Sequence, residues 1–256
     1  MNGKIIIANW KMNLPILSEW GKIKGLDGVE IVICPPFTHI GTLTKLLKGR
    51  NIKLGSQDCF WENQGAYTGE ISPLMLKNLG VEYVIVGHSE RRNYFSETDE
   101  MIAKKTKAVI ENGLTPILCI GETLEQRKRG LAKEIIKKQL ERDLKNSKFL
   151  ILNSKFRNHI VIAYEPVWAI GTGNYCQPKE ALEMIKFIKY FLNSKFHILK
   201  SRVIYGGSVD SKNIRDFLKY PEIEGALVGG ASIKIKEFQK IINEVSKPTK
   251  TKSAPK

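Results

Sequence analysis

Eight short apolar runs, rich in isoleucine and valine, recur along this 256-residue chain, and helix-like segments separate them. The runs are continuously apolar, a pattern typical of parallel strands that are covered on both faces. We expect the strands at Lys4–Ala8, Val29–Cys34, Ile52–Gly55, Tyr83–Val86, Thr115–Ile120, Ile160–Tyr164, Arg202–Tyr205 and Ala226–Val228. Eight β-α units in this length predict an α/β fold, a closed (β/α)8 barrel of parallel strands with surrounding helices.

Amphipathic segments between the runs predict the helices of the barrel. The long ones are expected at Thr38–Lys48, Glu97–Asn112, Leu131–Leu144, Lys179–Phe196 and Ile235–Val245, with a short helix at Pro15–Ile23 and a modest one after Ser211. We expect residues 1–246 to form a single catalytic domain. Residues 247–256 contain Lys and Pro without periodicity and are predicted to be a disordered basic tail.

Composition narrows the class of protein. No apolar run approaches the roughly 20 residues that cross a bilayer, and the first strand follows Met1 too closely for a signal peptide. The four cysteines form no CxxC or Cys/His cluster, so neither a disulfide framework nor a zinc site is expected. We therefore expect a cytoplasmic protein that needs no metal or cofactor and does not bind membranes.

The chain is strongly basic, with 41 Lys+Arg against 26 Asp+Glu and a formal net charge of +15. Such a charge suits binding of nucleic acid or an anionic surface, or the steering of an anionic substrate. The lysines are dispersed rather than clustered, which favours a Lys-rich surface of no specific function. Nucleic acid is therefore not the expected partner.

In (β/α)8 barrels the chemistry gathers where the strands end. Lys11 follows the first strand directly and predicts a fixed cation for an anionic substrate, a Schiff-base amine or a plain salt bridge. His88 follows the fourth strand, with Ser89 as the expected cap of a short helical turn. A helix N-terminus disfavours the cationic imidazole, so we expect His88 to be a neutral hydrogen-bond donor beside Glu90.

The sixth strand ends at a single carboxylate, Glu165. Pro166 follows at once, and Gly171 and Gly173 close the next segment, so we expect a base beside a movable lid. The alternative is a surface glutamate and an ordinary loop. Cys119, after the fifth strand, is expected to be a packed core thiol rather than a nucleophile.

Glycine pairs follow the last two strands, at 206–207 and at 229–230, with Ser208 beside the first pair. Backbone N–H groups at these two strand ends commonly bind phosphate in such barrels, although tight turns alone would also explain the pairs. No Walker loop or dinucleotide fingerprint accompanies them. The complete set suits proton transfer next to a carbonyl on a small phosphorylated substrate.

Taken together, the strand-end motifs resemble those of the triosephosphate isomerase family, over nearly the whole chain from Lys4 to about Val245. The motifs are Asn9-Trp10-Lys11-Met12-Asn13, Gly87-His88-Ser89-Glu90-Arg91-Arg92, Cys119-Ile120-Gly121-Glu122-Thr123, Ala163 to Gly173, Tyr205-Gly206-Gly207-Ser208 and Leu227-Val228-Gly229-Gly230-Ala231-Ser232. The resemblance implies a TIM barrel that interconverts dihydroxyacetone phosphate and D-glyceraldehyde 3-phosphate through an enediolate, in glycolysis and gluconeogenesis.

The resemblance also assigns roles, and the division between base and imidazole is a known property of the family. Catalysis is carried over to Glu165 as the base and His88 as the electrophile. Substrate binding is carried over to Asn9, Lys11, Gly171, Ser208, Gly229 and Gly230. Glu90 would lie near Lys11 and His88. Residues Trp168 to Thr172 would close over the substrate, with Tyr205 and Ser208 holding the closed form.

The stretch Gln57 to Ser72 is similar to the family's long third loop, which inserts into a second subunit with the Thr68 position beside the partner's active site. A homodimer is therefore expected from the resemblance.

The sequence departs from the family in three places. The connection from Leu14 to Gly28 is short, so the first helix is expected to cover the barrel poorly. The lid ends in an unusual sequence, Asn174-Tyr175-Cys176, and the rate at which the lid opens does not follow from it. The basic tail has no counterpart in the family. Two alternatives remain: a Schiff-base aldolase using Lys11, and a barrel with a second role in binding nucleic acid or an anionic surface.

Overall fold

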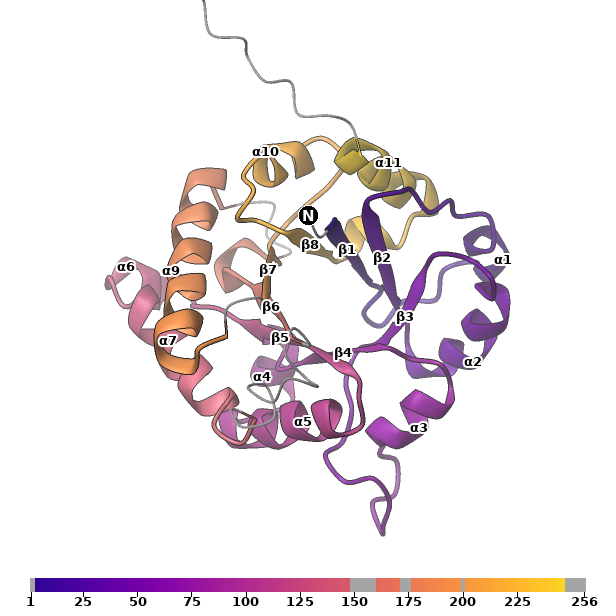
Figure 1. Ribbon diagram of the computed structural model, residues 1–256, viewed down its shortest axis with the longest axis horizontal. Helices are drawn as coiled ribbons and strands as arrows, with labels where there is room; N and C mark the ends of the chain where they lie inside the picture. Colours follow the sequence, from indigo (N-terminus) through magenta and orange to yellow (C-terminus); the bar gives the residue numbers. More distant parts are fainter. Residues whose placement is uncertain (1–2, 148–159, 171–175, 199–200, 247–256) are drawn as a thin grey trace, which may run out of the picture.

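The computed structural model describes residues 3–147, 160–170, 176–198 and 201–246. In this part of the chain eight parallel strands close into a barrel in sequence order, and β1 pairs with β8 (Figure 1). The strands are β1 (Lys4–Asn9), β2 (Val29–Cys34), β3 (Lys53–Ser56), β4 (Tyr83–Val86), β5 (Thr115–Ile120), β6 (Val161–Tyr164), β7 (Arg202–Tyr205) and β8 (Gly225–Val228). The predicted α/β barrel is confirmed, and every strand bound lies within one residue of its expected position.

The continuous apolar runs arise because both faces of the strands are buried. On β1, Ile5 and Ile7 point into a cluster inside the barrel, where side chains of the other strands, such as Ile85 and Ile204, meet them. The alternate residues, Ile6 and Ala8, pack outward against the helices. A packed interior leaves the chemistry to the strand ends.

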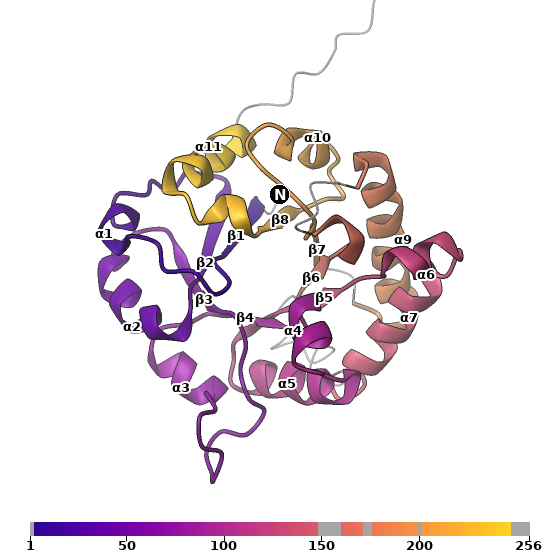
Figure 2. The ribbon, with the colours of Figure 1, turned by 180° about the vertical axis from the view of Figure 1, so that it is seen from behind.

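Helices form a ring around the strands (Figures 1 and 2). The five long helices that the sequence predicts are confirmed as α2 (Phe37–Leu46), α5 (Asp99–Glu111), α7 (Ala132–Asp143), α9 (Pro178–Phe196) and α11 (Ile235–Ser246). Shorter elements are α1 (Leu17–Trp20), α3 (Pro73–Asn78), α4 (Ser89–Tyr94), α6 (Leu124–Lys128), α10 (Ile214–Leu218) and the 3-10 turns η1 (Val167–Ala169) and η2 (Gly230–Ser232).

The first helix is short, as expected, yet it covers its side of the barrel. Trp20 is fully buried between two other rings, 4.6 Å from that of Trp10 and 5.6 Å from that of Phe238 on α11. One large side chain thus fills the space that the short connection leaves, and the expectation of poor cover is wrong.

Residues 57–72, which we call the third loop, project from the body of the barrel between β3 and α3 (Figures 1 and 2). Residues 62–70 of this loop are exposed to solvent. Helix α5 supports the loop: Lys104 Nζ lies 5.4 Å from the ring of Trp61, and Asn112 donates a 3.0 Å hydrogen bond to Asn63. In the described part of the chain no helix is long and apolar enough to span a membrane.

Candidate active site

The residues predicted from the strand ends meet in one pocket of about 220 Å³ at the C-terminal mouth of the barrel. Seven of the eight predicted site residues line it: Asn9, Lys11, His88, Glu165, Ser208, Gly229 and Gly230. The eighth, Gly171, lies outside the described residues. Five different strands therefore contribute to a single site.

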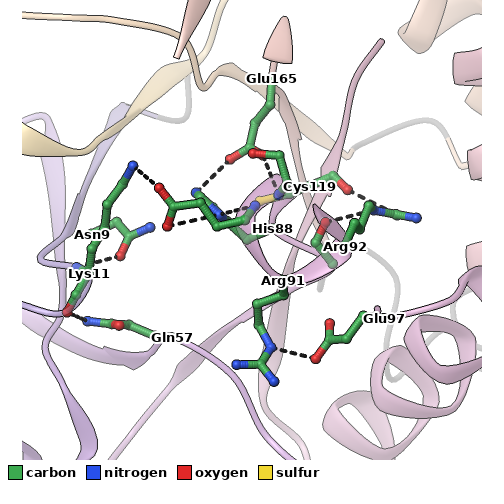
Figure 3. A network of polar contacts seen from close by, with 12 residues as sticks. Asn9, Lys11, Gln57, His88, Arg91, Arg92, Glu97, Cys119 and Glu165 are labelled. Atoms are coloured by element: carbon green, nitrogen blue, oxygen red, sulfur yellow. Dashed lines mark hydrogen bonds and ion pairs between the residues drawn. The ribbon is translucent and has the colours of Figure 1, made fainter. Parts of the chain in front are cut away.

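Glu165 comes directly off β6 and turns toward β4. Its backbone N–H donates to Ile120 O at 2.8 Å, which continues the strand pairing to the last residue before Pro166. Its side chain is buried, with Oε2 accepting from the Ser89 N–H at 3.1 Å and Oε1 lying 3.2 Å from His88 Nε2. Figure 3 shows the carboxylate of Glu165 beside the imidazole of His88.

The ring of His88 has a defined tautomer. The Glu90 N–H donates to His88 Nδ1 at 3.2 Å, so Nδ1 acts as an acceptor and carries no proton. The proton of the neutral ring then lies on Nε2, on the side of Glu165. His88, and not Ser89 as the sequence suggested, is the N-cap of α4, and Ser89 is the first helical residue. The capping bond to the ring comes from the Glu90 N–H. The Ser89 N–H is therefore available to donate to Glu165.

Lys11 lies in a strained backbone conformation at the end of β1. Its φ is +52°, in the left-handed region that costs most residues roughly 1–2 kcal/mol. Asn9 Oδ1 accepts the Lys11 N–H at 3.0 Å, and Gln57 Nε2 donates to Lys11 O at 2.9 Å and to Cys34 O at 3.0 Å. These bonds fix the backbone, and Lys11 Nζ pairs with Glu90 Oε1 at 2.5 Å.

Two glycines lie close to charged side chains of the site. A Cβ at Gly206 would be 2.8 Å from Glu165 Cγ, and one at Gly229 would be 3.2 Å from Lys11 Cε. Both glycines therefore leave space for the reactive groups. The hydroxyl of Ser208 makes its hydrogen bond within the protein, because it donates to Ala169 O in η1 at 2.7 Å.

Glu122 supports the site from outside the pocket, and the sequence suggested no role for it. Its side chain is fully buried, and Oε1 accepts from Tyr164 OH at 3.1 Å and from Trp168 Nε1 at 3.1 Å. Its carbonyl accepts the N–H of Val167 at 3.1 Å. Glu122 thus fixes the turn that follows Glu165. An acid two residues after the end of the buried strand β5 was the signal that could have revealed it.

Cys119 lies inside the barrel next to Glu165 (Figure 3). Burial raises the pKa of the Cys119 thiol well above its usual value, and the Glu165 carboxylate raises it further. Cys119 is therefore an unreactive thiol, as the sequence predicted. All four cysteines are buried and free. Within the described ranges no group of three His, Cys, Asp or Glu side chains is placed to hold a metal ion.

Comparison with known proteins gives a consistent result. The family model "Triosephosphate isomerase" matches residues 4–245. A protein named triosephosphate isomerase from Dictyoglomus thermophilum is 50% identical over 252 residues, which cover 94% of this chain and 99% of the relative. Relatives of the same name from Thermoanaerobacter pseudethanolicus and Trichodesmium erythraeum are each 45% identical, over 95% of this chain and 100% and 99% of their own length.

Proposed function

The chain belongs to the triosephosphate isomerase family, and we propose that it interconverts dihydroxyacetone phosphate and D-glyceraldehyde 3-phosphate without a cofactor. The observation that carries the proposal is the buried Glu165 carboxylate, 3.2 Å from a histidine nitrogen, in a pocket that Lys11 also lines. These groups are a base, a hydrogen-bond donor and a cation, which isomerisation through an enediolate requires.

In the first step Glu165 removes a proton from the carbon next to the carbonyl. The electron pair of that C–H bond forms the C=C bond of an enediolate, and the carbonyl oxygen takes up the negative charge. The Nε2–H of His88 donates to this oxygen, and the ammonium of Lys11, with the amide of Asn9, stabilises the charge. His88 gives its Nε2 proton to this oxygen and takes up the hydroxyl proton of the neighbouring carbon, which thereby becomes the new carbonyl carbon. Glu165 then returns its proton to the former carbonyl carbon, and the isomerisation is complete.

The contacts of Glu165 indicate what substrate binding must change. The carboxylate accepts the Ser89 N–H at 3.1 Å, and this bond must be released before the oxygen can reach a substrate carbon. A base held in a buried site has little water around it, so its charge acts more strongly on the substrate than it would in solvent.

Phosphate binding is assigned to the glycine-rich side of the pocket. Ser208, Gly229 and Gly230 line the pocket together with Lys11, which supports their role as contacts for the phosphate group. Gly171 is proposed as a further contact. Residues 168–172 are proposed to close over the substrate, because excluding water protects an enediolate from losing its phosphate.

A homodimer formed through residues 57–72 is the proposed assembly. The projection of this loop supports the proposal, as do large apolar side chains that solvent reaches in the single chain: Met12, Leu14, Ile16, Tyr67, Met75, Tyr94 and Phe95. Surfaces of this kind commonly mark protein interfaces. The cytoplasm is the proposed location, with glycolysis and gluconeogenesis as the pathways.

The aldolase alternative is not supported. A Schiff base requires the Nζ of Lys11 to attack a carbonyl carbon, whereas this atom is held by Glu90 Oε1 at 2.5 Å.

A coupled assay tests the proposed function. The purified chain should convert each triose phosphate into the other, with no cofactor other than the nicotinamide nucleotide of the coupling enzyme and at the same rate in the presence of EDTA. If neither triose phosphate is consumed, or if EDTA abolishes turnover, the proposal fails.

A further inference from the structure

The segment 171–175 is flanked by two groups of polar contacts that lie outside the pocket. On the side toward Glu165, Trp168 Nε1 donates to the buried Glu122 Oε1 at 3.1 Å. On the side toward α9, Glu180 Oε2 accepts the N–H of Gln177 at 3.3 Å and lies 3.7 Å from Cys176 Sγ. Each flank is therefore tied to one carboxylate.

Arg127 on α6 connects these two carboxylates. Its Nη1 lies 3.2 Å from Glu122 Oε1, and its Nη2 lies 3.2 Å from Glu180 Oε1. Its guanidinium carbon also lies 5.1 Å from the ring centroid of Trp168, at cation–π distance. A planar guanidinium can serve two carboxylates and a ring face at once, which a lysine ammonium cannot do as well.

We call the two ion pairs of Arg127, with Glu122 and with Glu180, the bridge. Burial decides which of these two ion pairs contributes more to the arrangement. The side chain of Glu122 is 0% exposed, that of Arg127 is 24% exposed and that of Glu180 is 45% exposed. An exposed ion pair contributes little by itself, because water and salt screen it. A buried carboxylate that loses its cation keeps a poorly compensated charge, which strongly disfavours the arrangement around it. Arg127 thus compensates the buried carboxylate that accepts the Trp168 N–H, and Glu180 contacts Arg127 from the exposed side.

We propose that Arg127 and Glu180 are positioning residues, which hold Trp168 and Cys176 at a fixed separation and so set the wall of the pocket beside the base. This inference rests on the proposed isomerase function. Neither residue is among those that line the described pocket, so they act through Trp168. Trp168 lies three residues after Glu165, and Ile170, two residues further on, lines the pocket.

Four variants test the bridge. Arg127→Met keeps an unbranched apolar stem and removes the charge, whereas Arg127→Lys keeps the charge but can no longer contact two carboxylates with two separate nitrogens. Glu180→Gln keeps an acceptor for the Gln177 N–H, so α9 retains its cap. The matched control is Glu183→Gln on the same helix, where Glu183 pairs with Lys133 at 2.9 Å and both side chains are exposed.

The expected kinetic result is graded. In Arg127→Met, kcat/KM should fall about tenfold, within the range of pairwise coupling between contacting side chains. In Glu180→Gln it should fall about threefold, since that pair is half exposed. The double variant should be no slower than Arg127→Met, because both changes break one bridge. Arg127→Lys should restore part of the loss, and Glu183→Gln should match the wild type.

A spectroscopic signal follows the same bridge without reference to activity. The chain has four tryptophans, so incorporation of 5-fluorotryptophan gives four fluorine signals, and Trp168→Phe identifies that of residue 168. Arg127→Met and Glu180→Gln should shift this signal and leave the other three in place. Glu183→Gln should shift none of them.

The measurements distinguish a failure of this inference from a failure of the proposed function. If the wild type is active and Arg127→Met changes neither kcat/KM nor the Trp168 signal, the inference is overturned and the proposed function stands. Additive losses in the double variant, or an equal loss in Glu183→Gln, also overturn it. An inactive wild type contradicts the proposed function, while a shifted Trp168 signal would still support the bridge.

Discussion

Gly206 leaves the space that the side chain of Glu165 occupies. A Cβ at this position would lie 2.8 Å from Glu165 Cγ and 3.2 Å from the carbonyl oxygen of Tyr164. Gly206→Ala must therefore displace the carboxylate, and a displacement of about 1 Å can cost roughly 10²-fold in rate. We expect kcat of this variant to fall by about that factor while KM changes much less, as steady-state kinetics will measure.

Gly41→Ala is the matched control, since a Cβ at this helical position would meet nothing within 4 Å. It should keep the wild-type kcat and gain up to about 1 kcal/mol of stability, because alanine favours the helix. Normal turnover in Gly206→Ala would show that the space beside Glu165 Cγ is not needed for the reaction.

Asp58, at the base of the third loop, links folding to pH. Lys105 Nζ holds both of its oxygens, at 2.7 and 2.9 Å, in a buried cluster with Glu97. Burial raises the pKa of Asp58 to about 6, which outweighs the attraction of Lys105. The native state thus binds this proton more tightly than the unfolded chain, where the pKa is near 3.8.

The stability that the proton on Asp58 contributes to the folded state is fully present below about pH 4 and is lost as the pH rises through 6. Asp58→Asn cannot titrate, so its free energy of unfolding relative to the wild type should rise between pH 4 and pH 7, by up to about 3 kcal/mol. Urea unfolding at several pH values and one protein concentration measures this. A relative stability that falls over the same interval would mean that the pKa of Asp58 is lowered instead.

Sequence reasoning found the site residues that directly follow strands, because the strand pattern fixes where such residues lie. It did not find the side chain that holds the backbone of Lys11 in place. The amide of Gln57 is 46 residues away from Lys11 in the chain, and only the closed barrel brings the two together (Figure 3). The same holds for the contact of Glu122 with Trp168, which spans 46 residues.

Among the described elements, α1 is the shortest α-helix, and Trp20 is the one buried residue of its four. Trp20 is fully buried against Trp10 and Phe238. Trp20→Ala should lower the free energy of unfolding by about 3–5 kcal/mol, the usual cost of truncating a buried aromatic residue. Denaturant unfolding measures the loss.

Trp20→Phe keeps a ring in the same place and should lose less than half as much. Equal losses in the two variants would mean that the indole, and not the filled volume, is what the structure needs.

The elements differ in how well the sequence predicts them. Strands and long helices follow from apolar periodicity, and the strand bounds are correct to one residue. Helices α3 and α6 were not predicted, because they have only six and five residues and too few turns to show a period. Their caps were readable, however: Ser72 accepts the Met75 N–H, and Thr123 and Gln126 form a capping box.

At the scale of the whole molecule, the third loop is the proposed contact between subunits. Replacing residues 62–70 with a short turn removes its exposed part and keeps Asp58 and the contacts at its base. The shortened chain should be monomeric by light scattering at concentrations where the wild type is a dimer. A shortened chain that still dimerises would place the interface elsewhere.

The central claim is that one carboxylate, Glu165, moves a proton between adjacent carbons of a triose phosphate. Proton NMR of dihydroxyacetone phosphate in D₂O tests it directly, because an enediolate exposes the transferred proton to solvent. Wild-type enzyme should place deuterium on the carbon next to the carbonyl as it isomerises the substrate. Glu165→Gln, which keeps the shape but cannot accept the proton, should be slower in both reactions by about 10²–10⁴-fold. Exchange and isomerisation at the wild-type rate in Glu165→Gln would contradict the account.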